Sequence, residues 1–177
     1  PSTRIAIKEL LDGLNGEDTE IAKQVTYDAV SYNGIKKANE KSFGKAVIPS
    51  YHFNKAKTIV SLSADFLGTW LMSNDYAVQY GEVRNPDGPW MARHYQFESL
   101  MSMTGSNADH RVAIKASEES KVVTALYNRI AASVGAEKIS IDTSAVDSYV
   151  ESAAADLLNS KGKSLVVSGS NEESIQL

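Results

Sequence analysis

The chain has 177 residues, of which 42% are hydrophobic and 23% are charged, a mixture that is able to form the packed core of one domain. A net charge of −4 with no basic stripe argues against nucleic acid as a partner. The lack of cysteine excludes disulfides, thiolate metal ligands and iron–sulfur ligation within these residues, and no apolar run approaches the roughly 20 residues that span a bilayer.

The N-terminal part of the sequence predicts two helices and one strand. Ser2 or Thr3 is a suitable N-cap for a helix that runs to about Asn15 and carries leucines along one face. The β-branched and aromatic residues of the segment 23–30 (KQVTYDAV) favour a strand. Helical spacing of apolar residues then predicts a second helix over 32–43.

The middle of the chain predicts three short strands. The apolar run 58–62 (TIVSL) is typical of a central strand in a parallel sheet. The alternating segment 94–98 (HYQFE) and the segment 110–114 (HRVAI) indicate two more strands. Between the first and second strands we expect a helix over 74–81 and a polar loop over 84–89.

Two helices and a last strand are predicted toward the C-terminus. The segment 117–134 starts with serine and glutamate, which favour a helix N-terminus, and it has an apolar face. A further helix is expected from Thr143 or Ser144 to about Ser160. The segment 164–168 (SLVVS) predicts a buried strand, followed by a turn and the start of another helix.

Alternation of strands and helices predicts an α/β fold, with an open, mostly parallel sheet and helices on both faces. We expect residues 1–177 to form a single domain of this kind, cut from a longer chain. Ligands of such sheets bind at the carboxyl ends of the strands. Those ends are predicted at residues 63–65, 98–99 and 169–171.

No nucleotide-binding, serine-hydrolase or zinc-protease motif occurs in the sequence. The nearest glycine-rich candidate, 168–171 (SGSN), has two interpretations, a phosphate-binding turn or an ordinary strand-to-helix turn, of which the second is favoured. His52, His94 and His110 are not paired at metal-ligand spacing. We therefore assign neither a catalytic residue nor a metal ligand.

Polar residues at the strand ends are the candidate ligand contacts. Ser63 and Asp65 follow the first apolar strand, where Asp65 is expected either to contact a ligand or to cap a helix. Glu98, Ser99 and Thr104 form a second group after the next strand, with the same two interpretations. Residue chemistry alone leads no further than an α/β domain of unassigned function.

Three longer stretches carry a resemblance to a known family. They are the segments 47–70 (VIPSYHFNKAKTIVSLSADFLGTW), 93–119 (RHYQFESLMSMTGSNADHRVAIKASEE) and 161–171 (KGKSLVVSGSN). Together they resemble the molybdopterin-oxidoreductase-like domain of the large iron–sulfur subunit of alternative complex III, a bacterial quinol:electron-acceptor oxidoreductase. Related subunits are often called iron–sulfur-cluster-containing hydrogenases. The resemblance extends over most of the chain and implies the α/β domain of the formate dehydrogenase and dimethyl sulfoxide reductase superfamily.

The pterin-binding elements of that superfamily are altered in this chain. Where the superfamily typically has Asp-Pro-Arg, the chain has 98–100 (ESL), and where it has Pro-Gly-Thr-Asp, the chain has 116–119 (ASEE). The Thr-Ala-x-x-Ala-Asp element is still similar to 104–109 (TGSNAD). The resemblance therefore implies that contacts to a pterin guanine dinucleotide have been lost. The vestigial cofactor-binding positions would be Ser63, Asp65, Glu98, Ser99 and Thr104.

The resemblance implies a non-catalytic structural and docking domain of a membrane-associated, quinol-oxidising electron-transfer complex on the periplasmic side of the bacterial inner membrane. It implies no cofactor in these residues and iron–sulfur clusters held by cysteines elsewhere in the parent chain. The implied partners are other domains of that chain and other subunits of a respiratory complex. Two alternatives stay open, namely the pterin-binding part of an active molybdopterin oxidoreductase or hydrogenase-like iron–sulfur protein, and a small-molecule-binding α/β module.

Overall fold

A computed structural model describes residues 2–15, 21–25, 27 and 29–177. Internal contacts divide the chain into two compact units, Pro1–Ser31 and Tyr32–Leu177. The sequence suggests one domain over the whole length, whereas the α/β fold belongs to the second unit. Each unit is described by itself.

The described part of the first unit contains the helix α1 (Ser2–Leu14), which confirms the first predicted helix. After this helix, Oδ1 of Asn15 accepts hydrogen bonds of 2.8 Å from the backbone N–H groups of Ile21 and Ala22. The strand predicted over 23–30 is wrong for the described residues of that segment, while 26 and 28 lie outside the described residues. Val25 and the other described apolar residues there are exposed, and β-branched residues form a strand only when a neighbouring strand pairs with them.

The second unit is built on a four-stranded sheet in the order β3-β2-β1-β4. All three strand pairs are parallel, which confirms the predicted α/β fold with an open parallel sheet. The strands are β1 (Thr58–Leu62), β2 (Arg93–Glu98), β3 (His110–Ala113) and β4 (Ser164–Ser168). Every residue of β1 is buried, as expected for an apolar strand with neighbours on both sides.

Helices and short 3-10 turns connect the strands and flank the sheet. The α-helices are α2 (Asn33–Phe43), α3 (Ser73–Val83), α4 (Met103–Ser106), α5 (Glu119–Val134), α6 (Glu151–Asn159) and α7 (Glu173–Gln176), and the 3-10 turns are η1 (Phe53–Lys55), η2 (Ala116–Glu118) and η3 (Asp147–Tyr149). Both α2 and α5 end on a glycine in the left-handed region, with φ of 71° at Gly44 and 74° at Gly135. Glycine adopts this conformation without the steric cost of a Cβ atom.

The helix predicted from Thr143 or Ser144 starts later than expected, at Glu151. Side chains hold the preceding segment in a different conformation. The carboxylate of Asp142 accepts hydrogen bonds from the backbone N–H and the hydroxyl of Ser144, and the Thr143 hydroxyl donates to Asp147. Such local side-chain hydrogen bonds compete with helical ones and delay the helix.

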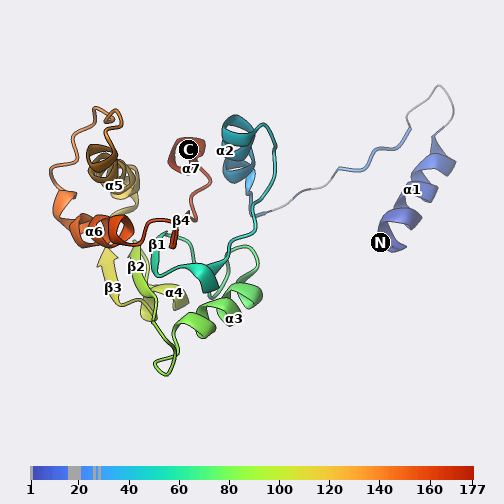
Figure 1. Cartoon of the computed structure of the whole chain (residues 1–177). Coiled ribbons are helices and arrows are strands. Elements are labelled where there is room, and N and C mark those ends of the chain that lie inside the picture. Colours follow the sequence, from blue (N-terminus) through green and yellow to red (C-terminus); the bar gives the residue numbers. More distant parts are fainter. Residues whose placement is uncertain (1, 16–20, 26, 28) are drawn as a thin grey trace. The chain divides into compact units, whose positions relative to one another are not determined.

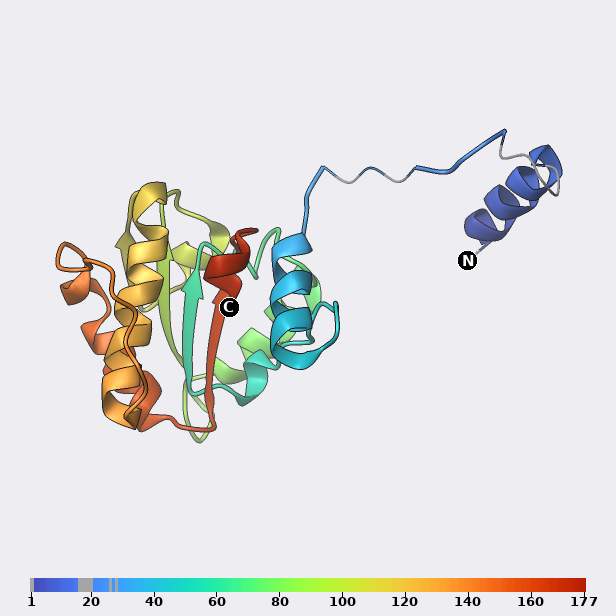
Figure 2. The same cartoon turned by 90° about the horizontal axis from the view of Figure 1, so that it is seen from above.

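Each face of the sheet carries its own apolar cluster. On one face, Val60 and Phe97 pack beneath α5 and α6. On the other face, Ile59 and Val167 pack with α3, η1 and Ile35 of α2. Figure 1 shows α5 and α6 on one side of the sheet and α3 on the other, and Figure 2 shows α2 beyond β4, on the side away from α5. Helices therefore cover both faces, as predicted.

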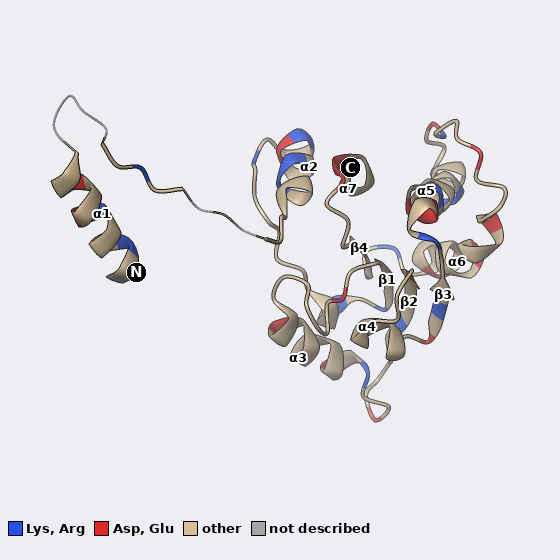
Figure 3. Cartoon of the chain, turned by 180° about the vertical axis from the view of Figure 1, so that it is seen from behind, with Lys and Arg blue, Asp and Glu red and all other residues tan. Residues whose placement is uncertain are grey.

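Charged residues of both signs are scattered over most elements of the second unit (Figure 3). None of the helices in the described part of the chain is long and apolar enough to cross a membrane.

Candidate functional site

The strand order creates one position where ligands commonly bind in open α/β sheets. The connection from β1 to β2 runs through α3 on one face, whereas the connection from β3 to β4 runs through α5 and α6 on the opposite face. The strand order reverses between β1 and β4, since β2 and β3 lie on one side of β1 and β4 lies on the other. The crevice outside the carboxyl ends of β1 and β4 is the topological switch point, where ligands of such folds bind.

At this switch point the segment that follows β4 packs backbone against backbone on the segment that follows β1. Gly169 donates a hydrogen bond of 2.8 Å to the carbonyl oxygen of Leu62, and a Cβ atom at Gly169 would collide with the Ser63 carbonyl. Ser63 has a φ of 53°, in the left-handed region that residues other than glycine rarely adopt. Only glycine fits at position 169, and the crevice is closed at this point by the protein itself.

The glycine-rich segment 168–171 forms a turn that uses its own hydrogen-bonding groups. The N–H of Ser170 donates to the hydroxyl of Ser168 at 3.1 Å, and the N–H of Glu172 donates to the hydroxyl of Ser170 at 3.2 Å. Asn171 accepts a hydrogen bond of 2.9 Å from the N–H of Gly34 and so ties the turn to α2. These contacts are those of a strand-to-helix turn rather than of an open phosphate cradle.

Asp65 and Thr104, which lie 39 residues apart in the sequence, are brought together by the pairing of β1 with β2. Oδ1 of Asp65 accepts hydrogen bonds from the N–H of Thr104 at 3.1 Å and from its hydroxyl at 2.8 Å. Oδ2 accepts two more, from the N–H and the hydroxyl of Thr69. The fully buried Thr104 hydroxyl also accepts from the N–H of Leu67. Asp65 therefore links the segment after β1, which contains Thr69, to the segment after β2, which contains Thr104.

Glu98 is 3% exposed, and both of its carboxylate oxygens are fully engaged. Oε1 accepts from Nε of Arg111 at 2.6 Å and from the N–H of Ser102 at 3.1 Å. Oε2 accepts from the Ser102 hydroxyl at 2.6 Å and from Nε2 of Gln96 at 3.1 Å. Burial raises the pKa of Glu98, but these hydrogen bonds outweigh it, so the pKa lies below its usual value and the carboxylate is charged.

The remaining two candidates are separate from this network. Ser99 is exposed and makes no hydrogen bond within the described part of the chain. Ser63 is exposed beside Glu119 at the start of α5. Burial raises the pKa of the Glu119 carboxyl, a hydrogen bond from Ser63 opposes this, and the nearby charge of Glu172 adds to the increase. One oxygen of Glu119 is buried without a hydrogen-bond partner among the described residues.

Sequence reasoning missed a buried polar row on β2. His94 and Gln96 are fully buried, and with Glu98 they occupy alternate positions on one face of the strand. Nε2 of His94 lies 3.3 Å from Oε1 of Gln96, and its Nδ1 lies 3.1 Å from the Tyr80 hydroxyl. Burial lowers the pKa of His94 to about 4, so the imidazole is neutral at pH 7. The alternation in HYQFE revealed the strand but not that its polar face is buried.

The histidines form no metal site. His52 and His110 are exposed, unlike His94. Among the residues that the structure describes, no three histidine or acidic side chains gather in a geometry that could hold a metal ion.

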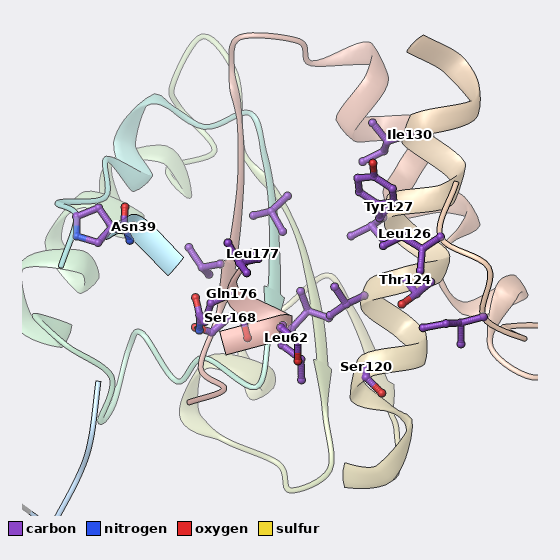
Figure 4. A pocket seen from close by; sticks show the side chains of 18 of the residues that line it. Asn39, Leu62, Ser120, Thr124, Leu126, Tyr127, Ile130, Ser168, Gln176 and Leu177 are labelled. Atoms are coloured by element: carbon purple, nitrogen blue, oxygen red, sulfur yellow. The ribbon is translucent and has the colours of Figure 1, made fainter. Parts of the chain in front are cut away.

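An open groove of about 940 Å³ runs along β4 (Figure 4). Leu126, Tyr127 and Ile130 of α5 form one wall, and the other side is formed by α2 and α7, including Asn39 and Leu177. None of the five predicted site residues lines it. The segment SLVVS could have indicated this groove. It has three consecutive apolar residues, one of which, Val166, is exposed.

Comparison with known proteins adds no relative, since neither the protein-family models nor the curated proteins contain a match to this chain.

Proposed function

We propose that the unit Tyr32–Leu177 is a non-catalytic docking domain of a larger electron-transfer protein. In this proposal the parent is an oxidoreductase subunit of a membrane-associated, quinol-oxidising complex, related to molybdopterin oxidoreductases and located on the periplasmic side of the bacterial inner membrane. Its partners are other domains of the same chain and other subunits. The observation that carries the proposal is that the strand-end polar groups are bonded to one another, while the open surface is an apolar groove.

The strand-end residues do not fit a pterin guanine dinucleotide. Such a ligand needs free donors and acceptors at the carboxyl edge of the sheet, because each polar group that it buries must be hydrogen-bonded. Asp65 already accepts four hydrogen bonds from the protein, and Glu98 also accepts four. Thr104 is fully buried between Asp65 and Leu67. Binding a cofactor there would first require these contacts to break.

The apolar groove supports a docking role. Open apolar surfaces on soluble proteins commonly mark sites of interaction with other chains. Here exposed apolar side chains of β4 and α5, such as Val166 and Tyr127, lie along one groove. Because the sequence contains no cysteine, the iron–sulfur clusters of the proposed complex would be held by other parts of the parent chain.

Purification of the parent protein from membranes tests this proposal. A tagged parent chain, isolated in mild detergent, is expected to copurify with quinol-dependent reduction of an artificial electron acceptor and to contain neither molybdenum nor pterin. Val166→Lys is expected to reduce copurification of the activity, since it places a charge in the groove. The matched control Val78→Lys changes an exposed valine of α3 outside the groove and is expected to have no effect.

Two results would contradict the proposal. Stoichiometric molybdenum or pterin that depends on Asp65 or Glu98 would favour the active molybdopterin oxidoreductase. A purified parent without quinol oxidation, together with a small molecule that raises the stability of the domain, would favour the binding module unrelated to redox chemistry.

A further inference from the structure

One edge of the sheet is open. Among the described residues β4 pairs only with β1, and the register matches Thr58 to Ser164 and Leu62 to Ser168. The carbonyl of Lys163 and the N–H of Gly169 point toward β1, because they bond to Thr58 and Leu62. Backbone groups alternate in direction along a strand, so those of Ser164 and Val166 point away from β1.

The open edge is exposed over most of its length. Ser164 is exposed, and Val166 is 46% exposed although its neighbour Val167 is buried. The carboxyl end is covered, since the side chain of Gln176 donates to the carbonyl of Ser168 at 3.0 Å. An uncovered strand edge is a template for another extended chain, because it presents unpaired N–H and C=O groups at the spacing of a strand.

The groove adds side-chain pockets to this backbone template. Val166 lines it together with Leu126 and Ile130 of α5, while Ile175 and Leu177 come from the opposite side (Figure 4). A second apolar hollow of about 330 Å³ continues past Val166 to Val134 and Leu157. Every second side chain of a chain paired with β4 would therefore meet apolar surface.

The two ends of the open edge carry opposite charges. Lys161 and Lys163 precede β4, are exposed, and form no ion pair within the described residues. At the carboxyl end, Glu119 and Glu172 lie close enough for their charges to interact. Neither of them has an ion-pair partner in the described part of the chain, and one Glu119 oxygen is buried and unbonded there.

We propose that the edge of β4 and the adjacent groove bind an extended peptide segment of a partner protein, which adds a fifth strand to the sheet. The segment has alternating apolar residues at its centre, acidic residues at the end beside Lys161 and Lys163, and a basic residue at the end beside Glu119 and Glu172. An ammonium or guanidinium group there would donate to the unbonded Glu119 oxygen. This proposal does not depend on the assignment to an electron-transfer complex.

Model peptides of about nine residues, the length of a typical strand with flanking charges, test the inference. The probes are DDVTVTVKK and its reverse KKVTVTVDD. The charges determine which end of the peptide lies at which end of β4, but they do not determine whether the peptide chain runs parallel or antiparallel to β4, so both sequences are tested. One of them is expected to bind below ~1 mM, and the amide proton of Val166 is then expected to exchange more slowly, measured by NMR. The same peptide with N-methyl groups on the amides that face β4 is expected to bind at least about tenfold more weakly, because it cannot donate to the edge.

Protein variants supply the matched controls. Val166→Lys is expected to weaken peptide binding about tenfold, whereas Val78→Lys on α3 is expected to leave it unchanged. Glu172→Lys should weaken binding of the better peptide, because it places a like charge beside the basic end of the peptide.

Several outcomes would overturn the inference. They are absence of binding by both peptides at ~1 mM, equal binding of the N-methylated peptide, and equal binding to Val166→Lys. Slow exchange of the Val166 amide without peptide, appearing only as the protein dimerises, would show that a second copy occupies the edge and would also overturn it.

Discussion

The carboxyl edge of β1 and β2 and the open edge of β4 differ in how far their hydrogen-bonding groups are bonded to neighbouring residues. At the carboxyl edge, Asp65, Glu98 and Thr104 are saturated by neighbouring residues. Along β4, the backbone groups of Ser164 and Val166 point away from the partner strand β1, and many of the surrounding side chains are apolar. The polar groups at the carboxyl edge are therefore bonded within the chain, whereas the apolar side chains along β4 line an open groove.

This difference has a physical basis. A buried carboxylate is tolerated only when its charge is paired and its oxygens are hydrogen-bonded, so the saturated edge has one stable arrangement. A strand edge in water loses little by remaining unpaired, because water replaces the missing bonds. Stability should thus be sensitive to substitutions at the first edge, and binding should be sensitive to substitutions at the second.

The largest expected effect is that of Glu98→Ala. The substitution leaves the half-buried Arg111 without its ion-pair partner and removes acceptors from Gln96 and Ser102. Breaking a buried pair on one side costs about 3–5 kcal/mol of unfolding free energy. Urea denaturation checks this. Glu137→Ala on an exposed loop is the control, expected within about 0.5 kcal/mol of wild type, and a similarly small change for Glu98→Ala would show that the network is not rigid.

Strands with a strong local signal were predicted from the sequence. The runs TIVSL and SLVVS coincide with β1 and β4 at both ends. β1 is buried throughout, as expected of a continuous apolar run, whereas β4 was predicted to be buried but is exposed at Ser164 and Val166. The segment 23–30 has similar residues, but its described part is not in a strand. A β-sheet depends on partners distant in sequence, so residue type alone cannot decide whether a strand forms.

The candidate site was predictable in position but not in role. Asp65 and Thr104 were expected at strand ends, but the hydrogen bonds between them depend on the pairing of β1 with β2. The role of Glu98 depends on Arg111, which a parallel neighbour brings beside it. Ser63 and Ser99 look equivalent in sequence, yet only Ser63 meets another element, at Glu119.

A second expected effect is the pH dependence that His94 contributes. Burial lowers the pKa of His94 to about 4, whereas an exposed imidazole has a pKa of 6.5. Below pH 6.5 the unfolded chain therefore binds a proton that the folded chain does not, and stability falls as the pH falls toward 4. The loss between pH 7 and pH 4.5 should be roughly 2–3 kcal/mol.

His94→Gln isolates this contribution, because all other titrating groups are present in both proteins. The variant is expected to be less stable at pH 7 but to lose roughly 2–3 kcal/mol less between pH 7 and pH 4.5. Urea denaturation at several pH values measures the difference. Parallel pH curves for the two proteins would mean that His94 takes up a proton in the folded state as easily as in the unfolded one.

Thr104→Val should have a smaller effect, because it removes a hydroxyl and keeps the shape of the side chain. Asp65 loses one of four donors, and the N–H of Leu67 loses its acceptor. Leaving such groups unsatisfied costs about 1–3 kcal/mol. Ser99→Ala is the matched control, since Ser99 was predicted in the same group but is exposed without a described partner, and its change should stay within about 0.5 kcal/mol. If Thr104→Val changed the unfolding free energy as little as Ser99→Ala, the Thr104 hydroxyl would be exposed to solvent like that of Ser99.

The smallest expected effect on stability is that of Val166→Lys at the open edge. Val166 is half exposed, and its backbone groups point away from β1, so the lysine ammonium is able to remain in water while the stem lies in the groove. The unfolding free energy should stay within about 0.5 kcal/mol of wild type, measured in urea, although binding of a strand peptide is expected to weaken about tenfold. A loss of more than about 2 kcal/mol would place Val166 in the core and remove the contrast between the two edges.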